Sequence, residues 1–416
     1  MTSVDGGKGS VPMTTEKPRL ASLTKYIPYP GIAHAGGQYL RAHYRALADR
    51  YAITALAPEN AVNRAAAAAS DLDDVRLLAG EGVFRRGRWK VLGDLEAAWA
   101  GSAINRHVRL AARRGDLEWD VLSSASVVEF QWSESFALAG AVKARLGATP
   151  LVGIAHDVIT QRWERAADAS AWPLRIAYAA AARRSRSREA RDMSHLSTVI
   201  VFSEKDAEMV RRIAPGTRTD IVAPGLWDGD TKYRQERPAD ARTVLFTGAL
   251  GRPDNESAVL WFLSEAWPSI RHRVPDAEFV VAGGGARPRL LRAIEKAPGA
   301  RATGFVDSLD PYYDDAAVFV VPLFTGAGVK FKTIDALLRG VPIVSTPVGV
   351  EGIAAAEQYC RVEQEAAGFA AAVVAQLLSA DTGLKVAERA AVWARSAYNV
   401  RTFADRLNEV YSDVDR

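Results

Sequence analysis

The segment that most constrains this chain is residues 322–342, which read PLFTGAGVKFKTIDALLRGVP. An apolar run ends there, glycines form a turn, and a helical pattern begins near Lys330 and stops at the next glycine. A strand, turn and helix in this order leave free backbone N–H groups that stabilise an anion. Lys330 and Lys332 add positive charge, and Asp335 can accept hydrogen bonds from sugar or ribose hydroxyls. A phosphate site and a plain turn with solvated lysines are both compatible with this pattern.

The same order of strand, turn and helix recurs along the chain, which is typical of a doubly wound parallel sheet. Strands are expected in the first half at 20–27, 51–56, 120–123, 151–155 and 198–202, and in the second half at 243–247, 278–282, 301–305, 318–321 and 342–345. Two successive halves of similar size predict an α/β protein. We expect this protein to consist of two Rossmann-like doubly wound domains that face each other across a cleft.

The domain boundaries are predicted from shifts in composition. Residues 1–18 are polar and rich in Gly, Ser and Lys, which predicts a disordered tail. The N-terminal domain is expected over 19–225 and the C-terminal domain over 226–395, joined where Pro, Gly and charged residues cluster. A helical pattern covers roughly 379–414. We expect its last part, 396–416, to cross back to the N-terminal domain.

Cysteine usage and charge exclude several classes of protein. The single cysteine, Cys360, excludes an internal disulfide and any multi-cysteine metal site, and we expect no metal cofactor. Residues 1–230 carry 31 Lys and Arg against 26 Asp and Glu, an excess too mild for a nucleic-acid partner. The first residues lack the apolar core of a secretory signal, and no apolar run reaches the length of about 20 residues that spans a membrane. We therefore expect a cytoplasmic protein.

Arginines are concentrated in residues 162–191, which hold eight of them against three acidic residues. Leu174, Ile176 and Tyr178 lie in the same segment. This combination is compatible with a peripheral contact of the N-terminal domain with the inner face of the membrane, or with a face for an anionic acceptor, although such a run more often forms a solvated helix.

Two further candidate binding segments directly follow predicted strands in the first half of the chain. His156 and Asp157 come directly after 151–155, at the carboxyl end of a parallel strand, where open α/β sheets bind ligands. His156 is therefore expected to bind or polarise a hydroxyl or to act as a general base. The alternative is a helix-capping aspartate beside a packed histidine. Gly36 and Gly37 open a helix after the first strand, as an amide-rich turn with or without a ligand.

The remaining glycines and histidines give weaker signals. The three glycines at 283–285 follow a strand, as in a dinucleotide-binding Gly-x-Gly-x-x-Gly fingerprint. The later glycine of that motif and its acidic residue are absent, so a structural turn is favoured. His34 borders the first glycine turn and stays open. The other histidines are expected at the surface or in packing, namely His43, His107, His195 and His272.

Seven segments form a pattern that extends over most of the chain. They are Gly36-Gly37, His156-Asp157, VIVFSEKDAEMV (199–210), IVAPGL (221–226), VLFTGAL with PDN (244–255), AEFVVAGGG (277–285) and the long stretch 302–352. Together they resemble the two-domain GT-B glycosyltransferases, specifically the large retaining group 1 (family 4). The last stretch resembles the subset with a Gly-x-Gly-x-Lys/Arg-x-Lys turn.

The resemblance implies a nucleotide diphosphate sugar as donor, held mainly by the C-terminal domain. It implies a glycan, lipid-linked or small-molecule acceptor in the N-terminal domain. By the same resemblance, His156 is expected to contact the donor sugar and Lys330 to balance leaving-group charge. Asp335 takes the place of the family's second Glu and is expected to hold the ribose. The other donor-binding residues that it implies are Gly36, Gly37, Arg252, Gly304, Phe305, Val306, Gly326, Gly328, Val329, Phe331 and Lys332.

Two departures from the family pattern concern charge. The first Glu of the family's Glu-x7-Glu motif falls on Ala327, and the usual Arg and Lys of an earlier loop fall near Ala249 and Asp254, where Arg252 is the basic residue. The sequence predicts a retaining, metal-independent hexosyltransferase. The alternatives are a non-catalytic relative that binds nucleotide sugar and a GT-B relative such as a sugar epimerase.

Overall fold

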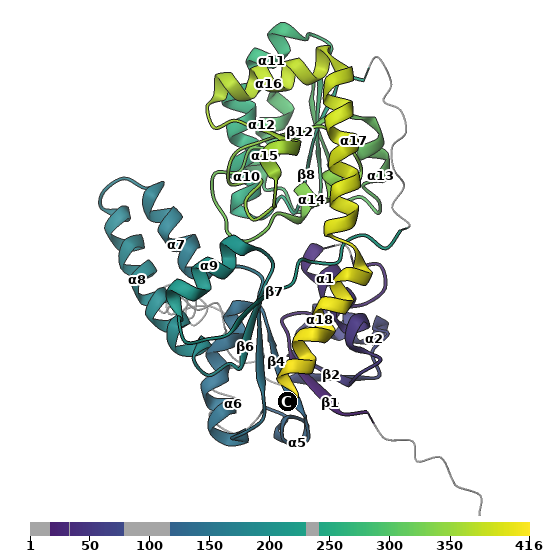
Figure 1. Cartoon of the computed structure of the whole chain (residues 1–416). Coiled ribbons are helices and arrows are strands. Elements are labelled where there is room, and N and C mark those ends of the chain that lie inside the picture. The colour runs from purple at the N-terminus through teal and green to yellow at the C-terminus, as the bar shows by residue number, and fades with distance from the viewer. Residues whose placement is uncertain (1–16, 33, 79–116, 230–240) are drawn as a thin grey trace, which may run out of the picture.

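The computed structural model describes residues 17–32, 34–78, 117–229 and 241–416; residues 1–16 of the predicted tail lie outside it. The chain forms two parallel sheets with helices on either side of each (Figure 1). The sequence prediction of an α/β protein with two doubly wound domains is confirmed.

The N-terminal sheet has the order β3-β2-β1-β4-β5-β6-β7. Its inner strands are fully or largely buried because helices cover both faces, which explains why most of them are runs of apolar residues, whereas the edge strands β3 and β7 are only partly buried. The strands are β1 (Arg19–Leu23), β2 (Ala52–Pro58), β3 (Asp74–Leu78), β4 (Val127–Gln131), β5 (Leu151–Ala155), β6 (Thr198–Val201) and β7 (Thr219–Ile221). Its helical elements are α1 (Ala35–Leu47), α2 (Ala61–Ala69), α5 (Trp119–Ser123), η1 (Ser133–Leu138), α6 (Ala139–Leu146), α7 (Ile159–Asp168), α8 (Leu174–Met193) and α9 (Glu204–Ile213).

The C-terminal sheet has the order β10-β9-β8-β11-β12-β13. Its strands are β8 (Thr243–Thr247), β9 (Glu278–Ala282), β10 (Ala300–Gly304), β11 (Ala316–Val321), β12 (Ile343–Ser345) and β13 (Cys360–Val362). Its helical elements are α10 (Pro253–Trp261), η2 (Phe262–Ala266), α11 (Trp267–Arg273), α12 (Pro288–Lys296), α13 (Asp310–Asp315), α14 (Phe331–Leu338), α15 (Ala356–Tyr359), α16 (Ala366–Leu378) and α17 (Ala380–Ala397). One apolar cluster fills this domain, from Val244 to Tyr398.

The predicted strand at 120–123 is wrong. These residues belong to helix α5, where Trp119, Val121 and Leu122 are buried. The strand lies a few residues later, at β4, and its five residues are all buried. Glu129 and Gln131 interrupt its apolar run, so the pattern of hydrophobic residues does not mark it.

The C-terminal end of the chain crosses from one domain to the other (Figure 1). The single helix expected over 379–414 is two helices, since α17 ends at Ala397 and α18 (Val400–Val414) begins after Asn399, whose side chain caps it. At this break the carbonyl of Tyr398 accepts hydrogen bonds from the amides of Leu226 and Trp227, at 2.9 and 3.0 Å. The two crossings of the chain between the domains are therefore paired.

Helix α18 packs on the N-terminal domain, beside α1. Asn408 donates a hydrogen bond to the carbonyl of Ala46 at 3.0 Å, and Tyr51 donates to Asp415 at 2.7 Å. No single described helix is long and apolar enough to cross a membrane, and α16 with residues 383–397 passes that test only as a pair bent by 98°.

Candidate active site at the domain interface

The turn between β11 and α14 has the backbone that an anion site requires. Gly326 and Gly328 have φ angles of +106° and +68°, a region that residues with a side chain rarely adopt. Helix α14 begins directly after Lys330, and the first amides of a helix have no partner within it. The turn therefore presents backbone N–H groups together with the positive end of the helix dipole.

This turn touches the carboxyl end of β5 in the other domain. A Cβ atom on Gly328 would lie 2.4 Å from the carbonyl oxygen of His156 and 3.0 Å from Cβ of Asp157. A similar approach joins Gly352 to Ser203, since a Cβ on Gly352 would lie 2.9 Å from Oγ of Ser203. The fold thus brings together the two segments that the sequence singles out most strongly.

Lys330 is buried at the centre of this interface, with a side chain only 9% exposed. Its Nζ donates a hydrogen bond to the carbonyl of Gly328 at 2.6 Å and lies 3.6 Å from a carboxylate oxygen of Glu351. Burial lowers the pKa of Lys330 to about 8. A buried ammonium gains from a further anion, because the protein around it does not hydrate the charge as water would.

Lys332 lies on the other side of the turn. Its Nζ donates to Oδ1 of Asn255 at 2.7 Å and sits 4.2 Å from the ring centre of Phe246. Burial lowers the pKa of Lys332 to about 7. Arg252 is nearby but 67% exposed, and it pairs with Asp254 at 3.2 Å. Two titratable lysines and one exposed arginine therefore surround the turn.

Asp335 occupies the second turn of α14 and is partly exposed. Burial raises its pKa, against the influence of Arg339, whose Nε lies 3.4 Å away. The predicted base-binding segment follows β10, where Gly304 has a φ of +71° and Phe305 is 68% exposed, while Val306 is partly buried. Val329 and Phe331 are partly buried and pack against the cores of both domains.

His156 sits in an aromatic enclosure. Its ring stacks on Trp132 at 4.3 Å between centroids, with an interplanar angle of 11°. Tyr39 and Phe202 meet it edge-on at 4.9 and 5.0 Å. Burial lowers the pKa of His156 to about 3, so the imidazole is neutral at physiological pH. Trp132 itself has a φ of +68°, an unusual backbone for a bulky residue, which places its ring against the histidine.

A buried chain of hydrogen bonds fixes the orientation of His156. Its Nε2 lies 3.3 Å from Oε1 of Gln131, and the Gln131 amide donates to Glu129 at 3.0 Å. Since a carbonyl oxygen only accepts, Nε2 of the neutral ring carries the proton and Nδ1 is left as an acceptor. Glu129 is fully buried, and it also accepts from His43 at 2.9 Å and from Tyr411 of α18.

This network is absent from the sequence prediction. His43, predicted at the surface or in packing, is fully buried, as the second alternative has it, and nothing in the sequence indicated its bond to the carboxylate of Glu129. Burial opposes ionisation of Glu129, but His43 and the surrounding donors hold its pKa below the ordinary value. A glutamate and a glutamine inside an otherwise apolar strand are the signal that could have marked it.

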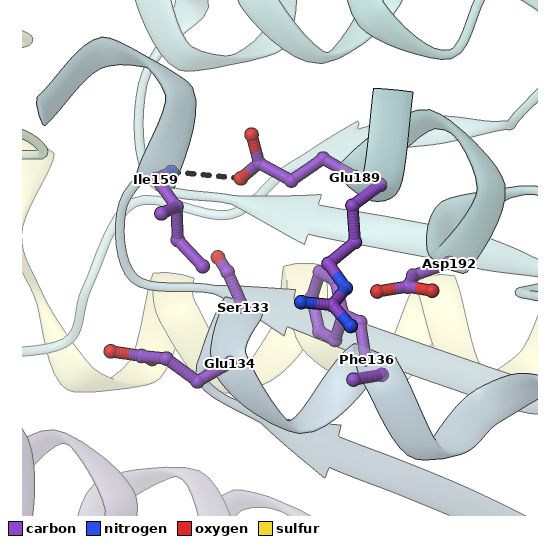
Figure 2. Close-up of a pocket in the computed structure, with 8 residues that line it drawn as sticks. Ser133, Glu134, Phe136, Ile159, Glu189 and Asp192 are labelled. Atoms are coloured by element: carbon purple, nitrogen blue, oxygen red, sulfur yellow. Dashed lines mark hydrogen bonds between the residues drawn. The ribbon is translucent and has the colours of Figure 1, made fainter. Parts of the chain in front are cut away.

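The Asp157 carboxylate accepts hydrogen bonds from Arg162 of α7. Burial would raise its pKa, but the ion pair with Arg162 holds it below its ordinary value. A small cavity of about 10 Å³ lies close by, between η1, the start of α7 and α8 (Figure 2). Glu189 at its wall accepts the amide of Ile159 at 2.8 Å, and burial raises the pKa of Glu189 to about 7. The cavity has room for one water molecule and not for a nucleotide.

Gly36 and Gly37 form the first turn of α1, which His34 caps by accepting the Gly37 amide at 3.0 Å. A Cβ on Gly37 would lie 2.2 Å from Cδ1 of Ile32, and one on Gly36 would lie 3.2 Å from the Trp132 ring. Both glycines thus allow close packing beside the aromatic enclosure of His156. His34, whose role the sequence does not decide, is a helix cap.

A cluster of charges across the interface is likewise absent from the sequence prediction. Glu351, after β12, accepts hydrogen bonds from Gln161 at 2.7 Å, from Arg165 at 2.8 Å and from Lys205 at 2.9 Å, all of which belong to the N-terminal domain. Burial opposes its charge, but Arg165 and the lysines lower the pKa of Glu351 to about 2. Arg165 also donates to the carbonyl of Gly326. The domains are therefore held together at the 326–328 turn.

Residues 241–379, from the start of β8 to the end of α16, match the family model described as Glycosyl transferases group 1. This part of the chain, about a third of its length, is similar to that family. A curated relative, an uncharacterized 44.6 kDa protein in the cps region of Klebsiella pneumoniae, is 34% identical over 117 residues. The match covers 26% of this chain and 30% of that protein, so the similarity spans less than a third of the relative.

Solved structures share the fold of this chain over both of its domains or over most of its length. The structure of HepE from Anabaena, in complex with UDP and glucose, has a TM-score of 0.67 at 12% identity, over 95% of this chain and 99% of that chain. A variant of S. aureus TarM, in complex with fondaparinux, alpha-GlcNAc-glycerol and UDP, has a TM-score of 0.53 at 8% identity, over 70% and 55%. These similarities establish the GT-B fold.

The comparisons leave the individual site residues of the glycosyl transferase domain as predictions. Among the described residues, no group of three or more His, Cys, Asp or Glu side chains could hold a metal ion. Metal-independent chemistry likewise remains a prediction from the sequence.

Proposed function

We propose that this protein is a glycosyltransferase that moves a hexose from a nucleotide diphosphate sugar to a hydroxyl acceptor. The observation that carries the proposal is the contact of the 326–328 turn with the end of β5. It joins the amides of α14 and the Lys330 ammonium to a neutral, oriented His156. The UDP complexes of the HepE structures support a nucleotide-sugar donor.

The donor's diphosphate binds at the start of α14, in this proposal. Amides of the first turn, Lys330, Lys332 and Arg252 stabilise the negative charge that develops as the sugar leaves. The Asp335 carboxylate accepts hydrogen bonds from the ribose, and the segment from Gly304 to Val306 lies against the base. Ala327 offers no carboxylate to the sugar, so the donor's sugar contacts rest on backbone groups and on His156.

Transfer proceeds with retention, by attack of the acceptor hydroxyl on the face from which the diphosphate leaves. The bond from the anomeric carbon to the phosphate oxygen breaks, and a bond from that carbon to the acceptor oxygen forms. The acceptor's proton passes to the departing phosphate. Neutral His156 adds no positive charge near the oxocarbenium-like carbon, and it hydrogen-bonds a hydroxyl of the transferring sugar.

The acceptor is a glycan, lipid-linked or small-molecule hydroxyl bound by the N-terminal domain. The fondaparinux and alpha-GlcNAc-glycerol in the TarM complex support a sugar-containing acceptor. We place the reaction in the cytoplasm, at the inner face of the membrane, in polysaccharide biosynthesis.

A thermal-shift screen against UDP, GDP, ADP, dTDP and their common sugars tests the donor site, since a ligand of the folded state raises Tm. We expect a shift with one nucleotide series and then release of that nucleotide in the presence of an acceptor. No shift with any nucleotide would reject the donor site. Binding without turnover over a broad acceptor panel would favour the non-catalytic relative, and epimerised or hydrolysed donor would favour another GT-B reaction.

A further inference from the structure

Helices α7 and α8 form a hairpin that stands out from the N-terminal domain (Figure 1). Side-chain contacts hold its two helices together along their length. Glu189 accepts the amide of Thr160 at 3.0 Å, Arg186 pairs with Glu164 at 2.7 Å, and the rings of Trp163 and Tyr178 stack at 6.0 Å. These contacts therefore hold in place the connection between the two helices, which lies beyond the stacked rings.

The tip of this hairpin, residues 171–177, is exposed at every position. Trp172, Leu174 and Ile176 are 77%, 58% and 57% exposed. They are three of the nine large apolar side chains that are exposed in the described residues, and they lie within five consecutive positions. Single exposed apolar residues need no explanation, but a cluster at the end of a protruding element indicates an interaction site.

The charge around the tip has one sign. Residues 169–188 contain five arginines and no aspartate or glutamate. Arg175 lies within the tip, and Arg183 follows about two turns later on α8, about 12 Å further from the tip at 1.5 Å per residue. Both side chains are exposed. A tryptophan with aliphatic neighbours and flanking arginines complements the boundary between acyl chains and anionic headgroups.

We propose that the tip of the α7–α8 hairpin inserts into the interface of a membrane that contains anionic lipid. Trp172, Leu174 and Ile176 enter the boundary of headgroups and acyl chains, while Arg175 and Arg183 contact lipid phosphates. The insertion of apolar side chains supplies part of the affinity, and each arginine adds attraction that depends on salt.

The inserted hairpin also orients the candidate active site. Helix α7 begins three residues after His156 and carries Arg165, which bonds to Gly326 and Glu351. Its ten residues extend about 15 Å from that end toward the tip. Docking therefore holds the reaction centre at a set height above the lipid, which favours a lipid-linked acceptor; this consequence, unlike membrane binding itself, rests on the proposed function.

Vesicle flotation of the full chain tests the insertion. We expect the protein to float with vesicles of phosphatidylcholine and phosphatidylglycerol, and not with phosphatidylcholine alone. Trp172→Ser with Ile176→Ser should reduce binding at least tenfold, and Arg175→Gln with Arg183→Gln about fivefold for each arginine at low salt. The matched control is Val392→Ser, which removes an apolar side chain that is 71% exposed on α17.

Two results would overturn the insertion. One is the absence of flotation with anionic vesicles, and the other is equal flotation of the Trp172→Ser, Ile176→Ser variant and the unaltered chain. Loss of self-association in that variant, measured by analytical ultracentrifugation, would assign the tip to contact between copies instead. Nucleotide binding and Tm of the hairpin variants should not change, so failure of the lipid contact is separable from failure of the donor site.

Discussion

The two halves of the candidate active site are built in opposite ways. In the C-terminal domain, the predicted phosphate and ribose contacts other than Arg252 lie within ten residues, from Gly326 to Asp335, on one turn and one helix. In the N-terminal domain, His156 is oriented by groups from β4, α1 and α18, and Tyr411 is 282 residues from the glutamate that it contacts. The C-terminal half is formed by a local backbone turn and one helix, and the N-terminal half depends on contacts between residues far apart in the sequence. Different perturbations should therefore disable them.

The largest effect is expected in the N-terminal network. Glu129→Ala removes the carboxylate that His43, Gln131 and Tyr411 share, and it leaves buried donors without a partner. Breaking a buried ionic cluster in this way costs about 3–5 kcal/mol of unfolding free energy. Urea unfolding followed by circular dichroism measures the loss. The control is Glu278→Ala, an exposed position in β9, which should change stability by about 0.5 kcal/mol or less. An equal effect of both variants would refute the network.

A second comparison separates chemistry from donor binding. His156→Ala should lower the turnover number by about 10²- to 10³-fold, the range for removing one preorganised hydrogen bond that acts in the transition state. Its donor affinity should change much less, because the diphosphate contacts lie in the other domain. Steady-state kinetics and calorimetry with the nucleotide sugar found in the screen give the two values. His272→Ala, at an exposed position on α11, is the control. An unchanged turnover number would remove His156 from the site.

A substitution in the C-terminal half of the candidate site should mainly affect nucleotide binding, the opposite of what is expected for His156→Ala. Lys330→Ala is expected to weaken nucleotide binding by about 10- to 100-fold, since a hydrogen bond to a charged group contributes roughly 1.5–3 kcal/mol. Titration calorimetry measures the change, and Lys296→Ala, an exposed lysine at the end of α12, provides the matched control. Unchanged nucleotide affinity would reject the role of Lys330, whereas the Glu129 network should remain intact in this variant.

The smallest expected effect is a pH dependence confined to the donor half. Burial lowers the pKa of Lys330 to about 8 and that of Lys332 to about 7, so both lose their protons as pH rises through this range. A bound diphosphate favours the charged ammonium forms, so binding takes up protons above pH 7. Affinity should then fall by up to tenfold per pH unit for each lysine.

Calorimetry in buffers of different ionisation enthalpy measures this proton uptake. In Lys332→Arg the guanidinium keeps its charge throughout, so the pH dependence should become shallower. Proton uptake that is absent in the unaltered protein, or unchanged in the arginine variant, would contradict the assignment.

Much of the C-terminal domain could be predicted from the sequence because its signals are local. The strands predicted at 243–247 and 278–282 coincide with β8 and β9. Gly326 and Gly328 predict a turn because glycine readily adopts a positive φ, and both residues have a positive φ in the structure. Predictions for the N-terminal domain are poorer. Strand β4 is fully buried, but its polar residues interrupt the apolar pattern by which a buried strand is recognised. Helix α5 resembles a strand in sequence because its short apolar run has no distinctive period.

The sequence by itself determined the α/β architecture, the glycine turn at 326–328 and the position of His156 after a strand. These depend on short-range patterns of glycine, apolar and charged residues. Only the tertiary structure decided that His43 and Tyr411 meet Glu129, and that Arg165 and Lys205 converge on Glu351. The physical reason is that a buried charge must find partners wherever the fold brings them, and residues far apart in sequence carry no local mark of that pairing.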